Sequence, residues 1–258
     1  MVRRPSAVLI SDSPSSAGSR RARPGTATLA FAVPLAALAY FLAAPALPAL
    51  PAGDATTLVA GAIGLLLVAA STLSLLPAHG SLIGPLLIAL GAGLLVAALN
   101  SDAARGVGAG ANVVEALLAG AGGLLLARWL TGARTAVVIP LFVAAIDIWS
   151  VMSGPSSRLL AGGTERVDAL SFDLPAWGDT GAAGHLGLSD AVFLSMFAAW
   201  AWRDGLRRGA TIAGMLLGLI GALVLSVALD TPIPALPFIA GGYLLPNADR
   251  LWRLIAAR

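Results

Sequence analysis

The sequence has no cysteine, no lysine and only two histidines among its 258 residues. Without cysteine the chain cannot form a disulfide, a thiolate zinc site or a cysteine nucleophile. Two isolated histidines do not provide the ligands of a metal cluster, so we expect no metal and no organic cofactor. Any chemistry must therefore come from hydroxyl groups, carboxylates or arginines.

Charged residues are also scarce: they make up 11% of the chain, against roughly one quarter of an average soluble domain. Hydrophobic residues make up 58%, and the mean hydropathy of +0.88 leaves too little polar surface to cover a water-soluble fold of this size. A pI near 10.5 would suit a nucleic-acid-binding protein if the arginines formed one basic face. Instead, they lie in short segments between apolar runs. The composition therefore predicts an integral membrane protein in contact with the lipid bilayer, with no nucleic acid as partner.

A helix needs about 20 mostly apolar residues to span a bilayer. The last apolar run contains Pro246, Asp249 and Arg250, so its apolar part can be as short as Pro234–Leu245 and need not cross the whole membrane. We expect an all-α, polytopic membrane helix bundle with about eight transmembrane helices, at residues 27–48, 55–77, 81–99, 109–130, 135–153, 183–202, 210–229 and 234–255.

The chain divides into three parts. Residues 1–26 are basic and have no apolar periodicity, so we expect a disordered cytoplasmic tail and no cleaved signal peptide. Residues 27–134 form an N-terminal four-helix transmembrane region, and residues 135–258 form a candidate catalytic transmembrane region with an outward loop at 155–182. Because cytoplasmic segments carry an excess of arginine, we favour the topology that places 13 of the 16 arginines inside. This topology predicts a multi-pass protein of a bacterial or archaeal-type plasma membrane, with both termini in the cytoplasm.

Two of the expected spans contain an aspartate inside their apolar run, Asp147 and Asp190, with no basic residue within a turn. An aspartate at the centre of a membrane helix costs about 2.5–3.5 kcal/mol on insertion scales, so its presence points to a function. At about 1.5 Å per residue, Asp147 would lie roughly 9 Å and Asp190 roughly 10 Å from the outer ends of their helices. Two carboxylates at the same depth can share one proton, so that one activates water and the other protonates a carbonyl.

Each aspartate also has a simpler interpretation. Ser189 and Asp190 are good N-terminal capping residues and could cap a helix that begins later than expected. Asp147 could be the proton-relay or cation-binding residue of a transporter. Glu115 lies about a turn inside the fourth expected span, near the membrane interface, and we assign it no catalytic role.

Three short motifs follow one another in the second half of the chain: Ile146-Asp147, Gly187-Leu188-Ser189-Asp190 and Pro234-Ala235-Leu236-Pro237. Their order resembles that of Tyr-Asp, Gly-x-Gly-Asp and Pro-Ala-Leu-Pro in the presenilin and signal peptide peptidase family of intramembrane aspartyl proteases. The resemblance covers roughly residues 135–245. Ile146 stands where that family has tyrosine, Ser189 stands where it has the second glycine, and the family usually has nine spans.

The resemblance implies an intramembrane aspartic endopeptidase with Asp147 and Asp190 as the catalytic pair. It implies that the enzyme cleaves transmembrane segments, in particular leftover signal peptides or single-span proteins with a cytoplasmic N-terminus. A proton-coupled transporter and a noncatalytic homologue that binds membrane helices remain open as alternatives. Prepilin peptidases have a similar Gly-x-Gly-Asp aspartate, but they cut at the cytoplasmic face. The substrate-binding residues implied by the family motifs are Gly187, Leu188, Ser189, Pro234, Ala235, Leu236 and Pro237.

The expected outward loop contains one segment with strand periodicity. From Ala169 to Leu174 the apolar residues Leu170, Phe172 and Leu174 alternate with smaller or polar ones, as in a half-buried strand. An exposed strand edge could hold an unwound substrate by β-augmentation, in which case Leu170 and Phe172 also belong to the substrate-binding site. An ordinary surface turn is the alternative.

Overall fold

The structure, a computed structural model, describes residues 24–49, 51, 53–80, 82–99, 108–153, 171–178 and 182–256. Most of the expected tail and of the expected outward loop therefore lies outside the described residues. The described chain is mostly helical and contains one two-stranded sheet. Its elements are α1 (Pro24–Ala43), η1 (Ala44–Ala46), α2 (Asp54–Leu73), η2 (Leu76–Ala78), α3 (Ile83–Leu99), α4 (Gly108–Trp129), α5 (Thr135–Ser153), β1 (Ser171–Pro175), β2 (Ala182–Gly187), α8 (Leu188–Arg203), α9 (Arg208–Leu229), α10 (Leu236–Leu244), η4 (Leu245–Asn247) and α11 (Ala248–Ala256).

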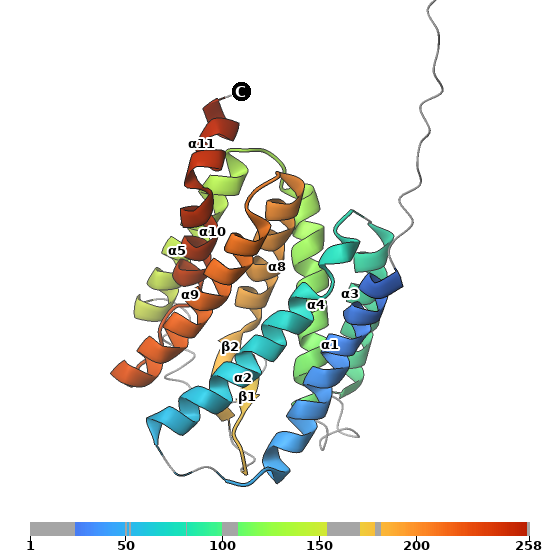
Figure 1. The fold of residues 1–258 in the computed structure, drawn as a ribbon, viewed down its shortest axis with the longest axis vertical. Coiled ribbons are helices and arrows are strands. Elements are labelled where there is room, and N and C mark those ends of the chain that lie inside the picture. The colour runs from blue at the N-terminus through green and yellow to red at the C-terminus, as the bar shows by residue number, and fades with distance from the viewer. Residues whose placement is uncertain are drawn as a thin grey trace, which may run out of the picture.

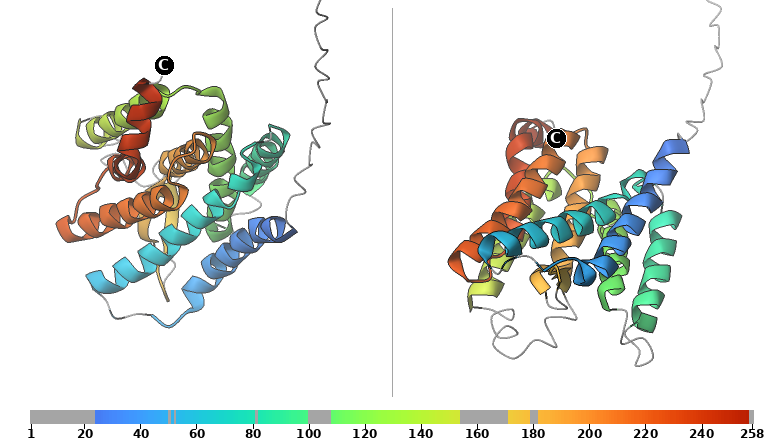
Figure 2. Two further views of the ribbon diagram at one scale, coloured as in Figure 1. Left: turned by 45° about the horizontal axis from the view of Figure 1, so that its top comes forward. Right: turned by 60° about the horizontal axis from the view of Figure 1, so that its bottom comes forward.

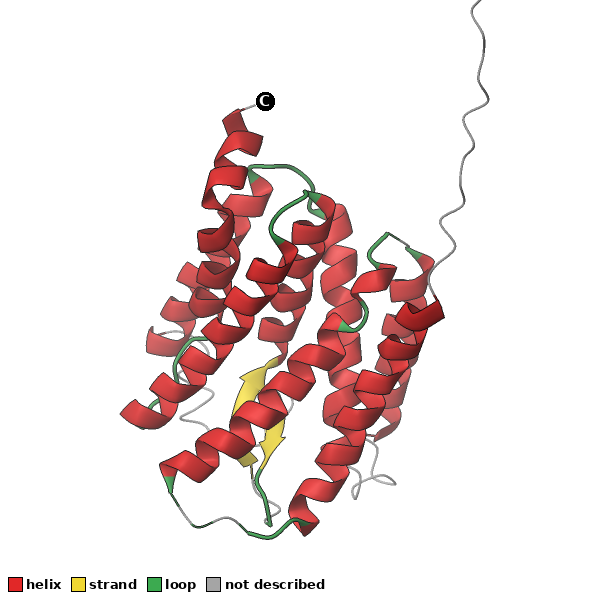
Figure 3. Cartoon of the chain, in the orientation of Figure 1, coloured by secondary structure: helices red, strands yellow, loops and turns green. Residues whose placement is uncertain are grey.

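The long helices pack side by side in a bundle, with the short sheet at one end (Figures 1 and 3). At its centre α4 packs against α8; α4 also contacts α1, α2 and α3, whereas α8 also contacts α9 and α10. Helix α5 packs mainly against α10, on the side of the bundle away from α1 and α3 (Figure 2). The expectation of an all-helical bundle is therefore confirmed at the level of helix content, with the sheet as an addition.

Glycine allows two of these helix pairs to pack closely. A Cβ atom added at Gly123 of α4 would collide with the carbonyl oxygen of Val192 in α8. One added at Gly214 of α9 would collide with the carbonyl oxygen of Gly242 in α10. Since only glycine lets backbones approach this closely, these contacts hold α8 and α10 in definite positions on their neighbours.

Four of the described helical segments are long and apolar enough to cross a membrane: Asp54–Ala78, Ala111–Trp129, Thr135–Ser153 and Arg208–Leu229. The described apolar parts of α1 and α3 are shorter. The described part of the chain is thus compatible with a membrane protein, but the expected number of eight transmembrane helices is not supported.

Two of the expected spans are shortened for local reasons. Residues 183–187, which we expected to open a helix, belong to β2, so α8 begins only at Leu188. The single helix expected at 234–255 is divided into α10, η4 and α11. Pro246 lies in η4, and proline disrupts a helix because it lacks an N–H group and clashes with the preceding turn.

Strands β1 and β2 form an antiparallel hairpin in which Phe172 pairs with Leu186 and Leu174 pairs with Gly184. Phe172 and Leu174 are fully buried, whereas Asp173 between them is exposed. The predicted strand is therefore confirmed over Ser171–Leu174, with its apolar side turned into the core. Leu170 lies outside the described residues.

Candidate active site

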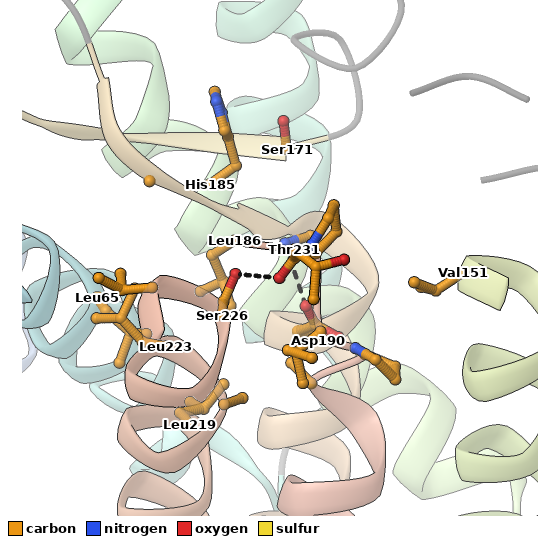
Figure 4. A pocket seen from close by; sticks show the side chains of 18 of the residues that line it. Leu65, Val151, Ser171, His185, Leu186, Asp190, Leu219, Leu223, Ser226 and Thr231 are labelled. Atoms are coloured by element: carbon orange, nitrogen blue, oxygen red, sulfur yellow. Dashed lines mark hydrogen bonds between the residues drawn. The ribbon is translucent and has the colours of Figure 1, made fainter. Parts of the chain in front are cut away.

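A cavity of about 720 Å³ opens at the sheet end of the bundle (Figure 4). Its walls come from β2, the first turn of α8, the end of α9, the segment before α10, and side chains of α2 and α5. Both Asp147 and Asp190 line it. The opposite end of the bundle, with the α4–α5 turn, the α8–α9 turn and α11 (Figure 1), contains all the arginines of the described residues, namely Arg128, Arg134, Arg203, Arg207, Arg208, Arg250 and Arg253.

Asp190 lies in the first turn of α8. Its Oδ2 atom accepts a hydrogen bond of 3.1 Å from the backbone N–H of Gly187, the residue that precedes the helix. The expectation that Asp190 lies well inside its helix, in a span that begins at residue 183, is wrong, because the chain before Leu188 is a strand. The helix begins later than expected, but its N-cap is Gly187, so Ser189 and Asp190 lie in the first turn and do not occupy the capping position that the simpler interpretation gave them. A first-turn carboxylate suits the positive end of the helix dipole. The residue is nevertheless part of the cavity wall and is 8% exposed.

Asp147 lies in α5, six residues before the helix ends at Ser153. Its Oδ2 atom accepts a hydrogen bond of 3.0 Å from the backbone N–H of Leu236, at the start of α10. The first N–H groups of a helix lack partners within the helix, and the neighbouring Pro237 has no N–H to offer. The carboxylate therefore connects α5 directly to the Pro-Ala-Leu-Pro segment, a bond that the sequence did not predict.

The two aspartates, 43 positions apart in the chain, face one cavity. Both side chains belong to the wall of this cavity. Each has one oxygen oriented by a backbone N–H group. Two oriented carboxylates on one cavity wall are the arrangement that acid–base pairs use when they share a proton and act on a bound carbonyl.

The structure brings together some of the expected substrate-binding residues and separates others. Gly187, Ser189, Pro234 and Ala235 line the cavity beside the aspartates. Leu188, Leu236 and Pro237 are adjacent in the chain but are not part of the lining. Phe172 is fully buried in the core, because the apolar side of β1 faces the helices, and its side chain is not available to a ligand. Leu170 lies outside the described residues.

The strand that borders the cavity is β2, which sequence reasoning missed. Residues Ala183 to Gly187 all belong to the lining, whereas β1 contributes only Ser171. The β2 sequence, Ala-Ala-Gly-His-Leu-Gly, has no apolar alternation, so its strand conformation depends on pairing with β1. The one signal in the sequence that β2 borders the site was its position directly before Gly187-Leu188-Ser189-Asp190, here called the Gly187 motif.

The cavity wall is acidic. Among the described residues, its lining includes, besides the central pair, Asp54 at the start of α2 and Asp230 at the end of α9, with His185 as the basic group and no arginine. Asp230 adopts the left-handed conformation, with φ of 46°, and caps the C-terminus of α9. Among the residues that the structure describes, no group of His, Asp or Glu is placed to hold a metal ion.

Comparison of the chain with models of known protein families, with curated proteins and with solved structures gives no match. Any functional conclusion must therefore be argued from the residues and geometry of this chain.

Proposed function

We propose that the protein is an intramembrane aspartyl protease, similar to presenilin and signal peptide peptidase, with Asp147 and Asp190 as its catalytic pair. One observation carries the proposal: the three motifs that suggest the family in the sequence converge on one cavity. Asp147 and Asp190 face it together, the Gly187 motif orients Asp190, and the Pro-Ala-Leu-Pro segment is bonded to Asp147.

In the proposed reaction the pair carries one proton. The ionised carboxylate removes a proton from water as the water oxygen attacks the scissile carbonyl carbon, and the protonated carboxyl gives its proton to the carbonyl oxygen. The neutral gem-diol then collapses: one carboxyl protonates the amide nitrogen, the other removes a proton from a diol hydroxyl, and the C–N bond breaks. Water is consumed, a carboxylic acid and an amine leave, and the pair again holds one proton.

The proposed substrate is a transmembrane peptide that becomes extended near the cavity. A peptide in an extended conformation can add to the edge of β2 through main-chain hydrogen bonds, and this strand leads directly into the turn of α8 that carries Asp190. Leftover signal peptides and single-span segments with a cytoplasmic N-terminus are the proposed physiological class.

The proposed orientation places the arginine end of the bundle in the cytoplasm and the cavity toward the outer face, because arginine is enriched on the cytoplasmic side. Both termini would then be cytoplasmic in a multi-pass protein. Reporter fusions after Thr164 and after Gly205 test this assignment. The first should report the outer side and the second the cytoplasm; the reverse pattern would exclude both the orientation and the substrate class.

The activity is tested with purified protein in detergent and a labelled transmembrane peptide. Wild type should cut the peptide, whereas Asp147→Asn, Asp190→Asn and the double variant should be equally inactive, because residues that act as one unit have non-additive effects. Glu115→Gln is the matched control: it removes a half-buried carboxylate of α4 that is not part of the cavity wall. Cleavage by either single variant would refute the assignment. Proton-coupled uptake in vesicles without cleavage would instead favour a transporter.

A further inference from the structure

The buried side chain of Asn112, in α4, binds the backbone of β1. Its Nδ2 atom donates a hydrogen bond of 3.0 Å to the carbonyl oxygen of Asp173, and its Oδ1 atom accepts one of 3.1 Å from the N–H of the same residue. In an antiparallel sheet, a residue of the neighbouring strand makes the same two bonds, one to the N–H and one to the C=O of the residue opposite it. The carboxamide of Asn112 therefore takes the place of a strand on the outer edge of β1, at a position where it is only 6% exposed.

The position of Asn112 determines which edge of the hairpin can receive a peptide. Asp173 lies opposite His185 in the register. In an antiparallel sheet, the N–H and C=O groups of two opposite residues either bond to each other or point away from the partner strand. The N–H and C=O groups of Asp173 bond to Asn112, so they point away from β2 and toward α4. The opposite edge of the hairpin, formed by β2, borders the cavity. With Asp173 in the middle of the β1 edge occupied by Asn112, we expect an added peptide strand to pair with β2 and not with β1.

Helix α4 also supports the catalytic side of the cavity. It packs closely on α8, where Gly123 meets Val192, and the hydroxyl of Ser195 in α8 donates a hydrogen bond of 2.8 Å to the carbonyl oxygen of Gly120. The same helix thus positions the hairpin through Asn112 and Asp190 through α8. The distance along the bundle between a docked peptide strand and the carboxylate is consequently set by α4.

The hairpin has other attachments that keep it folded without Asn112. Trp177, just after β1, donates a hydrogen bond of 2.9 Å to the hydroxyl of Tyr40 in α1, and Gly178 donates one of 3.1 Å to the carbonyl oxygen of Ala44. These bonds hold the turn end of β1, whereas Asn112 holds its middle. Loss of Asn112 should therefore loosen the strand without detaching it.

We propose that Asn112 is a positioning residue that restricts peptide docking to β2 and fixes the register of the docked peptide relative to Asp190. This inference rests on the proposed protease function, because a register has a chemical consequence only where a peptide bond is cut. Asn112 takes no part in the reaction itself. It acts by fixing the position of β1, and through it that of β2, along the bundle axis relative to the catalytic pair.

The test compares Asn112→Ala with Thr72→Val. The hydroxyl of Thr72 in α2 also bonds to α4, at the carbonyl oxygen of Ala116, one turn beyond Asn112 and away from the hairpin. The control therefore removes a buried hydrogen bond to the same helix without touching β1. Two quantities are measured: hydrogen exchange of the hairpin amides in the peptide-free protein, and the set of bonds cut in a labelled transmembrane peptide, read by mass spectrometry.

Asn112→Ala should raise the exchange rate of the β1 amides about tenfold, since the peptide group of Asp173 loses both of its partners. It should also spread cleavage to bonds about two residues from the main site, because a slip of two keeps each side chain on its own side of a strand. The total turnover number should change little while KM rises. Asn112→Gln, which keeps the carboxamide, should restore part of the exchange protection, and Thr72→Val should behave as wild type in all measurements.

Exchange rates and cleavage positions unchanged in Asn112→Ala would overturn the inference. If wild type cuts no peptide, the protease proposal fails, and the docking role is then judged by exchange alone. Protection of the β2 amides by added peptide in wild type, weakened in Asn112→Ala, would still support docking to β2. Equal protection in both proteins, or none in wild type, would refute it.

Discussion

Two substitutions of Asp147 separate its chemical role from its structural one. Asn keeps an oxygen that can accept the hydrogen bond from the N–H of Leu236 but cannot act as a carboxylate. Ala removes the acceptor as well, and leaves the N–H of a residue that is 5% exposed without its partner. We expect both variants to be inactive but to differ in stability.

The expected difference follows from the bond between α5 and α10. Leaving a buried donor unsatisfied costs about 1–3 kcal/mol. One kcal/mol shifts the Tm of a protein of about 150–250 residues by roughly 2–4 °C, so Asp147→Ala should melt roughly 2–12 °C below Asp147→Asn. Both variants lack the carboxylate at position 147, so any effect of its charge cancels when they are compared with each other. The comparison therefore isolates the hydrogen bond.

The assay is thermal unfolding in one detergent at one scan rate, followed by tryptophan fluorescence, together with the peptide cleavage assay. Equal melting temperatures for the two variants would show that the bond to Leu236 does not hold α10. Cleavage by Asp147→Asn would refute the catalytic assignment itself, whatever the melting temperatures.

Three other predictions follow, two for the cavity and one for the arginine-rich end of the bundle. A Cβ atom at Gly187 would lie 3.0 Å from Oδ2 of Asp190. Gly187→Ala should therefore displace the carboxylate and lower kcat/KM about tenfold or more without loss of folded protein. Unchanged kinetics would show that activity does not depend on this orientation of the carboxylate. Hydrogen bonds from Arg207 lower the pKa of Asp249 from 3.8 to about 2, so the contribution of this pair to stability should be complete above about pH 4 and lost as the pH falls toward 2. The melting temperatures of wild type and Asp249→Asn should accordingly converge over that range, and a constant difference would contradict it. Because the described cavity wall is acidic, peptides with a basic residue at their outer end should be cut faster than neutral ones. Asp230→Asn should reduce this preference in a salt-dependent way. An equal reduction in the cleavage of neutral peptides would argue against a charge effect.

The aspartates could be found from the sequence because carboxylates in apolar helices are costly and therefore rare. Asp147 and Asp190 stood out against their neighbours without any knowledge of the fold. The position of Asp147 within its helix was predictable, because that helix ends where the apolar run ends. That of Asp190 was not predictable, since a segment rich in glycine and alanine is compatible with a helix or a strand, and pairing with β1 decided between them.

Local sequence also predicted β1 but not β2. Phe172 and Leu174 alternate with polar neighbours, so the pattern reports which side of the strand is buried. Ala183 and Gly184 carry no such pattern, and their conformation is decided by main-chain hydrogen bonds to another segment. The same reason hides Asn112, which looks like any polar residue near a helix start until its carboxamide is seen against the backbone of β1.

The sequence by itself determined the apolar, helical character of the chain and singled out the two carboxylates, because hydropathy and charge are properties of each residue. The tertiary structure alone decided which polar groups meet: Asp147 with the N–H of Leu236, Asp190 with that of Gly187, and both with the edge of β2 around one cavity. Hydrogen bonds act over about 3 Å, whereas these partners are up to 89 positions apart in the chain. Only the packing of the helices that carry them brings such groups within that distance.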